Sequence, residues 1–243
     1  MENVSDFKDK EYNKKYKKAL ISQSHVVFPA ILSELGEING KRVLDLGCGS
    51  GDFSSMLSGK GAKVDGADIS DTWIEMAKED HKEDPNLNFF VADSSDINMI
   101  GDNQYDVVIM NMVFLNISSK EKVEKTFEEV SRILKLGGDF IFTDLHPLCK
   151  MTPDTLTGHQ ELLEGFSYFK DGSNFKSKVK PLDNPSSIDF FNKHWTIETY
   201  TKLINDFGMH IYRIIEPFPI EDAPEMYNDY KVPEYIIFHC KKD

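Results

Sequence analysis

Between residues 40 and 145, short apolar runs rich in β-branched residues alternate with stretches in which apolar side chains recur at helical spacing. Five of the runs predict strands that are buried on both faces: Arg42–Leu46, Lys63–Ala67, Leu87–Val91, Asp106–Met110 and Asp139–Thr143. Strands that alternate with helices in this way imply right-handed crossovers between parallel strands. We therefore predict an α/β fold with a doubly wound sheet, whose ligand lies beyond the carboxyl ends of the strands.

The helix before the fifth of these strands has a predicted start and a predicted end. It begins at Ser118 or Ser119, because Ser118 and Glu121 have the spacing of a capping box. Its apolar side chains recur on one side over the next four turns. Gly137–Gly138 is predicted to end it as a C-terminal cap.

Residues 146–195 break the alternation and contain several turn signals. Within them, EGFSYFKDGSNFKSKVK predicts a hairpin around an Asp171–Gly172 turn, with Phe166 on the first strand and Phe175 on the second. A loop of about fifty residues without structure is uncommon in a compact domain. We therefore predict a cap insertion after strand five. Its aromatic side chains suit an apolar or planar substrate, or equally a small core of the cap itself.

Regular structure is predicted to resume after the cap. Thr196 is a candidate N-cap for a helix that Gly208 ends. The stretches MHIYRIIEP and PEYIIFHCKK then predict two last strands, which we expect to form an antiparallel pair at the edge of the sheet.

Composition and charge narrow the class of protein. The chain has 243 residues, and 41 acidic against 28 basic residues give a formal net charge of −13. Phosphate backbones repel so acidic a chain, so we expect no nucleic-acid partner. Four lysines among residues 14–18 are interpreted as a solvated helix face. We predict a single domain over residues 1–243, with an N-terminal helical lid at 1–38 and the cap at 146–195.

The cysteines and the hydropathy indicate a cellular location. Cys48, Cys149 and Cys240 lie far apart and show no Cys-x-x-Cys spacing. This argues against disulfides and against zinc, and suits a reducing cytoplasm. The N-terminal residues have no apolar core of the signal-peptide kind, and no apolar stretch approaches the roughly 20 residues of a membrane span. We expect a cytoplasmic protein without a membrane partner or a metal site.

The stretch VLDLGCGSGDF, residues 43–53, predicts a loop that approaches a nucleotide. It has no Gly-Lys-Ser/Thr sequence to open a helix, which excludes a phosphate-binding P-loop. Asp52 stands where a dinucleotide loop has its third glycine and would face a pyrophosphate, which disfavours NAD. Asp68, 23 residues after Asp45, ends the next strand. The spacing suits an adenosine with a cationic amino-acid tail, although an NAD protein also has an acid at that point.

Five ordered motifs, VLDLGCGSGDF, VDGADIS, FVADSSDI, YDVVIMNMVFLNI and LKLGGDFIFTD, carry a resemblance over residues 40–145. Together they resemble the class I S-adenosylmethionine-dependent methyltransferases of the small-molecule type. The resemblance implies a Rossmann-like, seven-stranded, mostly parallel sheet with an antiparallel edge strand. It also implies S-adenosylmethionine as cofactor and S-adenosylhomocysteine as product. It assigns the cofactor to these residues: Tyr16, Asp45, Gly47, Gly49, Asp68, Ile69, Asp93, Ser94, Asn111 and Met112.

The resemblance also implies what each part of this set does. Asp45 orients the loop or contacts the amino group of the methionine part, and the Asn111 carbonyl accepts from that ammonium. Asp68 binds the ribose hydroxyls, and Asp93 accepts from the adenine amino group. Tyr16 belongs to the N-terminal lid, or else packs against the core. Strand ends and polar turns are also polar for purely structural reasons, which is the alternative for Asp93 and Asn111.

Methyl transfer from a sulfonium is an in-line displacement that needs chiefly alignment. A base is needed only where the acceptor must lose a proton. His146 and His194 are the candidates for this base, since both are expected near the carboxyl end of the sheet; the alternative for each is a structural histidine.

We expect a small-molecule acceptor methylated on O, N or C, because Asn111–Phe114 lacks the Pro-Pro-Tyr/Phe type of sequence of DNA amino-methyltransferases. Three alternatives stay open: another sulfonium reaction such as a cyclisation, an NAD-dependent oxidoreductase, and a non-catalytic binding module. The sequence leaves the oligomeric state open.

Overall fold

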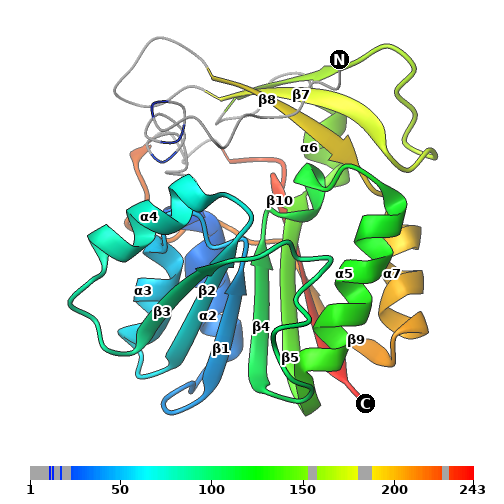
Figure 1. Ribbon diagram of the computed structural model, residues 1–243. Helices are drawn as coiled ribbons and strands as arrows, with labels where there is room; N and C mark the ends of the chain where they lie inside the picture. The colour runs from blue at the N-terminus through cyan, green and yellow to red at the C-terminus, as the bar shows by residue number, and fades with distance from the viewer. Residues whose placement is uncertain are drawn as a thin grey trace.

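The computed structural model describes residues 11, 13, 17, 23–152, 158–179, 188–225 and 230–243. Its main feature is a seven-stranded sheet (Figure 1). In spatial order the strands are β3 (Leu87–Val91), β2 (Lys63–Asp68), β1 (Arg42–Leu46), β4 (Tyr105–Asn111), β5 (Leu134–Leu145), β10 (Tyr235–Lys242) and β9 (Met209–Ile215). The first five are parallel, and β10 is antiparallel to both β5 and β9. The predicted doubly wound sheet with an antiparallel pair at its edge is confirmed.

Helices cover both faces of this sheet (Figure 1). The described helical segments are η1 (Gln23–Val27), α2 (Phe28–Leu35), α3 (Asp52–Ser58), α4 (Asp71–Asp80), η2 (Phe114–Asn116), α5 (Lys120–Ile133), α6 (Pro147–Met151) and α7 (Ile197–Asp206). Alternate residues of each central strand pack into different cores, as the period of a strand requires. In β4, Val107 and Ile109 pack with η1, α2 and α3, whereas Val108 and Met110 pack with α5 and α7.

Helix α5 starts at one of the two predicted serines, but the predicted capping box and the predicted end are wrong. The N-cap is Ser119, whose hydroxyl accepts from the backbone N–H of Lys122, so Ser118 and Glu121 form no capping box. The helix ends at Ile133 and passes directly into β5. Gly137–Gly138 therefore lies within β5, where the pairing with β4 jumps from Leu134 to Asp139. The glycines serve this irregularity in the strand and do not cap the helix.

A second sheet of three antiparallel strands follows α6. It consists of β6 (Gly158–Leu162), β7 (Ser173–Val179) and β8 (Ile188–His194), in that order. Figure 1 shows it lying across the end of the large sheet where α6 follows β5, which is the carboxyl end of that strand. The Trp195 indole N–H donates to the Phe114 carbonyl at 2.8 Å and ties the end of β8 to the main domain.

A hairpin forms here, between β6 and β7, but its connection spans residues 163–172 and is not a tight Asp171–Gly172 turn. Phe166 lies in the connection between β6 and β7, and only Phe175 is on a strand. The Asp171 carboxylate instead accepts from the Thr196 backbone N–H and from the Thr199 hydroxyl, at the start of α7. The aspartate that predicted a turn thus holds the first residues of the next helix in place. That helix begins after Thr196, as expected.

Candidate functional site

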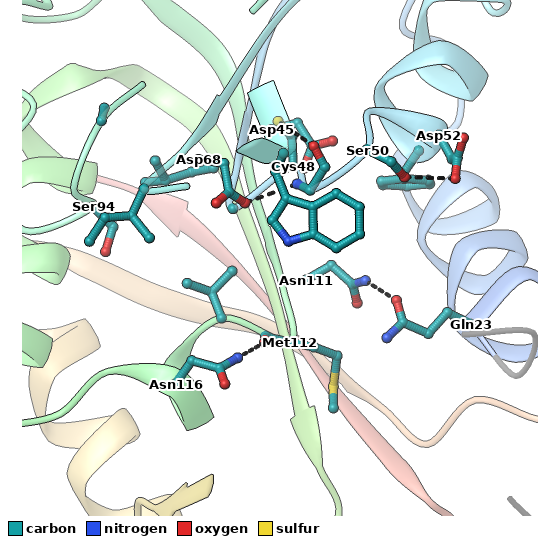
Figure 2. A pocket seen from close by; sticks show the side chains of 18 of the residues that line it. Gln23, Asp45, Cys48, Ser50, Asp52, Asp68, Ser94, Asn111, Met112 and Asn116 are labelled. Atoms are coloured by element: carbon teal, nitrogen blue, oxygen red, sulfur yellow. Dashed lines mark hydrogen bonds between the residues drawn. The ribbon is translucent and has the colours of Figure 1, made fainter. Parts of the chain in front are cut away.

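A cavity of about 810 Å³ opens beyond the carboxyl ends of β1, β2 and β4. Nine of the ten residues predicted to contact the cofactor line it: Asp45, Gly47, Gly49, Asp68, Ile69, Asp93, Ser94, Asn111 and Met112. The tenth, Tyr16, lies outside the described residues. Figure 2 shows the labelled side chains arriving from several strand ends and converging on one space. The cavity is therefore at the position where open α/β sheets bind their ligands.

The glycine loop after β1 needs glycine for two different reasons. At Gly47, with φ +85°, a Cβ atom would lie 2.3 Å from a Val113 methyl group, and at Gly51, with φ +77°, it would lie 2.7 Å from the Phe89 ring. Both positions are closed by packing. At Gly49, with φ +53°, no atom lies within 4 Å of an added Cβ. Gly49 therefore leaves open space on the wall of the cavity, where a ligand can come close to the backbone.

Asp68, at the end of β2, is held by the loops on either side of it. Its Oδ2 accepts from the Gly49 N–H at 3.0 Å, and its Oδ1 accepts from the Ser70 N–H at 2.9 Å. Burial raises the pKa of this carboxyl above its ordinary value, against the effect of these N–H donors. The hydrogen bonds fix the direction of the carboxylate at the edge of the cavity.

Asp45 is the more deeply buried acid, with 2% of its surface exposed. The Ser54 hydroxyl donates to its Oδ2 at 2.6 Å. Burial raises the pKa of Asp45 to about 6, despite that hydrogen bond, and the nearby charge of Asp68 adds to the increase. The two carboxyls give this end of the cavity a strong preference for a cation, since a positive charge would relieve their mutual repulsion.

A chain of hydrogen bonds crosses from β5 to the N-terminal part of the chain. The Met112 N–H donates to Thr143 Oγ1 at 2.9 Å, and the Thr143 hydroxyl donates to Asn111 Oδ1 at 2.6 Å. The Asn111 amide then donates to Gln23 Oε1 at 2.6 Å (Figure 2). Met112 has φ +57°, which is rare for a residue other than glycine and is typical of functional sites. Sequence reasoning missed Gln23, because no motif includes it.

Asp93 and two lysines lie on the wall of the same cavity. Asp93 accepts from Lys122 at 2.8 Å and from the Ser95 N–H at 2.9 Å. Burial alone would raise its pKa, but these donors hold the pKa below its ordinary value. Lys17 forms ion pairs of 3.0 Å with Asp52 and of 3.1 Å with Asp80. Of the four lysines predicted to form a solvated face, Lys17 is partly exposed and borders the cavity, and the other three lie outside the described residues.

Neither candidate base lines the cavity. His146 is the N-cap of α6: its Nδ1 accepts from the Leu148 N–H, and its Nε2 donates to Glu216 at 3.0 Å. His194 is 1% exposed and donates from Nε2 to the Tyr168 carbonyl at 2.8 Å. Burial lowers the pKa of both imidazoles, which keeps them neutral near pH 7. A base role for either histidine stays a prediction.

Fold and site together define a class of protein. A mostly parallel seven-stranded sheet with one reversed strand next to its edge, a glycine loop after β1 and an acid at the end of β2 are typical of class I S-adenosylmethionine-dependent methyltransferases.

In the described parts of the chain, no helix is long and apolar enough to cross a bilayer.

Known proteins agree with this class. A family model described as a methyltransferase domain matches residues 43–138. The Bacillus subtilis protein YqeM, assigned as a methyltransferase, is 28% identical over 193 residues, which are 73% of this chain and 76% of that protein. Arsenite methyltransferase of Mus musculus is 32% identical over 57% of this chain, but the chain spans only 40% of that protein.

Among solved structures, an S-adenosylmethionine-dependent methyltransferase from Listeria monocytogenes superposes with a TM-score of 0.65 at 27% identity. The match covers 89% of this chain and 97% of that one. The chain belongs to the class I S-adenosylmethionine-dependent methyltransferases. It is therefore a methyltransferase, of a class whose cofactor is S-adenosylmethionine.

Proposed function

We propose that the chain transfers the methyl group of S-adenosylmethionine to an O, N or C atom of a small molecule. The observation that carries the proposal is the position of Asp68: its carboxylate ends β2, is fixed by two backbone N–H groups, and borders a cavity next to the glycine loop. A carboxylate held in this way is suited to accept from both hydroxyls of a ribose.

The shape and charge of the cavity fit the cofactor. Its volume of about 810 Å³ lies within the range of small-molecule sites. The open space at Gly49 admits a ligand against the backbone, and the acids Asp45 and Asp68 suit a sulfonium and an ammonium group. When bound, S-adenosylmethionine supplies an already activated methyl group.

The remaining wall residues receive the following proposed roles. Asp45 and the Asn111 carbonyl face the ammonium group of the methionine part. Ile69 packs against the adenine: its apolar side chain lines the cavity and is 62% exposed. Asp93 and Ser94 bind the polar edge of the adenine, with Lys122 holding the Asp93 carboxylate in position.

For the acceptor, the net charge of −13 and the small sheet after β5 favour a small molecule over a nucleic acid. Arsenite, the substrate in the name of one relative, is less well supported. Trivalent arsenic prefers thiolate ligands, and Cys48 is the only cysteine on the described wall of the cavity. Cys149 and Cys240 are buried, and burial raises the pKa of both thiols.

Alignment is proposed to supply most of the catalysis. His146 and His194 both lie off the described wall of the cavity, so the proposal does not depend on a histidine base. An acceptor that is already deprotonated, or that carries a neutral amine, would need none.

Calorimetric titration tests the cofactor half of the proposal. S-adenosylhomocysteine should bind the purified protein, and Asp68→Asn should weaken that binding by roughly tenfold or more, because charge-assisted hydrogen bonds to the ribose are lost. Asp71→Asn is the matched control: Asp71 is exposed, does not line the cavity, and should leave the affinity unchanged. Binding of NAD without binding of S-adenosylhomocysteine would contradict the proposal.

Turnover tests the reaction and the acceptor. A thermal-shift screen of metabolites with S-adenosylhomocysteine present should show extra stabilisation only with an acceptor that fits. Methyl transfer to that acceptor releases S-adenosylhomocysteine, whereas a cyclisation of the aminocarboxypropyl group releases methylthioadenosine. Methylthioadenosine as the only nucleoside product would contradict methyl transfer.

A further inference from the structure

The hydrogen-bond chain at the floor of the cavity runs from Met112 to Gln23. The Thr143 hydroxyl accepts from the Met112 backbone N–H and donates to Asn111 Oδ1. The Asn111 amide nitrogen donates in turn to Gln23 Oε1. Gln23 thus uses its amide oxygen as the acceptor for Asn111.

The Gln23 amide is left with its nitrogen free. Gln23 is 4% exposed and lines the cavity, and its Nε2 makes no hydrogen bond within the described structure. Figure 2 shows the amide nitrogen turned away from Asn111. The nitrogen atom itself is accessible from the cavity, so a ligand there can accept from it. The wall therefore presents a fixed pair of N–H donors beside Asn111.

The charges around the cavity indicate what this donor binds. Four aspartates line the described wall, and the two lysines there are already paired, Lys17 with Asp52 and Asp80, and Lys122 with Asp93. An anionic group in such a cavity needs a neutral donor that is held in place. S-adenosylmethionine has one anionic group, the α-carboxylate, on the same carbon as the ammonium group that the Asn111 carbonyl is proposed to bind.

We propose that Gln23 binds the α-carboxylate of the cofactor through Nε2, with Thr143 as a positioning residue that sets the orientation of the amide through Asn111. The inference rests on the proposed function. It makes η1, which precedes the methyltransferase motifs in the chain, part of the cofactor site: the bound carboxylate bridges Gln23 to the strand ends.

Two ligands that differ in the amino-acid tail test the proposal by calorimetry. S-adenosylhomocysteine carries the carboxylate, and 5′-methylthioadenosine keeps the nucleoside but lacks the ammonium and the carboxylate. Gln23→Glu replaces the donors by a negative oxygen that still accepts from Asn111. It should weaken S-adenosylhomocysteine roughly tenfold or more and change methylthioadenosine less than about twofold. Gln104→Glu, the same change at an exposed position away from the cavity, should alter neither affinity.

Two further variants ensure that the conclusion does not rest on Gln23→Glu alone. Gln23→Leu removes the donors without adding charge and should weaken S-adenosylhomocysteine alone. Thr143→Val removes the hydroxyl that orients the amide and should have a smaller effect of the same selectivity. Wild-type affinity for S-adenosylhomocysteine in both Gln23 variants would overturn the inference. An equal loss of affinity for both ligands would also overturn it, since Gln23 would then contribute only to the shape of the cavity. A wild-type protein that binds neither ligand would contradict the proposed function itself.

Discussion

At the scale of single residues, Asp45 is a buried acid of the cavity whose pKa is strongly raised. Its pKa is raised to about 6 by burial, so it is protonated at pH 5 and ionised at pH 7. Because the folded protein holds this proton more tightly than an unfolded chain, Asp45 lowers the stability of the ligand-free protein as pH rises from about 4 to 6. A ligand that places a cationic group beside Asp45, such as the ammonium group of S-adenosylhomocysteine, reverses that cost.

The affinity for S-adenosylhomocysteine should therefore rise with pH, by up to about tenfold per unit below pH 6, and level off above pH 7. Asp45→Asn, which keeps the shape and still accepts from Ser54, should flatten this dependence. Titration calorimetry from pH 5 to pH 8 measures both. An equally steep pH dependence in the variant would assign the titration to another group.

Gly49 and Gly51 should respond differently to the same substitution. Gly51→Ala places a methyl group against Phe89 at a positive φ and should cost about 2 kcal/mol of unfolding free energy or more. Gly49→Ala has only the backbone strain, about 1 kcal/mol, but fills the open space on the cavity wall and should weaken S-adenosylhomocysteine binding. Urea denaturation and calorimetry separate the two effects. The opposite order of stabilities would contradict this account of the loop.

At the scale of elements, the residue at which a helix begins depends on which side chain accepts a hydrogen bond from its first backbone N–H groups. The cap of α5 is one case: Ser119 rather than Ser118 accepts from the first turn. Ser119→Ala should cost about 1 kcal/mol of unfolding free energy. Ser118→Ala, one residue earlier, should change stability by less than about 0.5 kcal/mol. Equal losses in urea denaturation would show that the two serines share the cap.

The same scale shows where sequence reasoning succeeds. The central strands β1 and β4 were predictable because both of their faces are largely buried, which makes them continuous apolar runs. The junction of α5 with β5 was not, since Gly137–Gly138 has the composition of a helix cap but serves a shift in strand register. Asp171 misled in a similar way, because its partners at the start of α7 are more than twenty residues away in the chain.

The site follows the same division. Nine wall residues were predictable because the motifs that place them are local, each at the end of one strand. Gln23, Lys17 and Lys122 reach the cavity only through tertiary folding, and no spacing in the sequence relates them to it. His146 and His194 lie near strand ends in the sequence, which predicted that they would reach the cavity. Their rings instead contact Glu216 and the Tyr168 carbonyl.

At the scale of the whole molecule, one buried histidine links segments that lie far apart in the sequence. His239 of β10 lies between Glu34 of α2, at 2.9 Å, and Asp139 of β5, at 2.8 Å. Burial alone would lower its pKa, but the two carboxylates raise the pKa above the ordinary value. Arg213 also pairs with Glu34, and Lys241 with Asp139, so the cluster is a shared network of charges.

A histidine whose pKa is raised on folding stabilises the protein fully below the pKa of the unfolded chain, about 6.5, and loses this effect as pH rises through the folded pKa. The stability advantage of the wild type over His239→Gln should therefore be largest near pH 6 and shrink toward pH 9. Chemical denaturation at several pH values measures it. A constant difference across this range would exclude a charged His239.

The place of β10 in the sheet has a consequence for how the chain is made. β10 lies between β5 and β9, although it follows both in the sequence, and β9 pairs with no other strand of the described sheet. While the protein is being synthesised, β5 therefore presents an open edge, and β9 leaves the ribosome with no strand to pair with. The sheet closes only when residues 235–242 emerge. An unpaired strand edge in a nascent chain favours association with other chains. The nascent protein should therefore be most prone to aggregation before β10 has been synthesised.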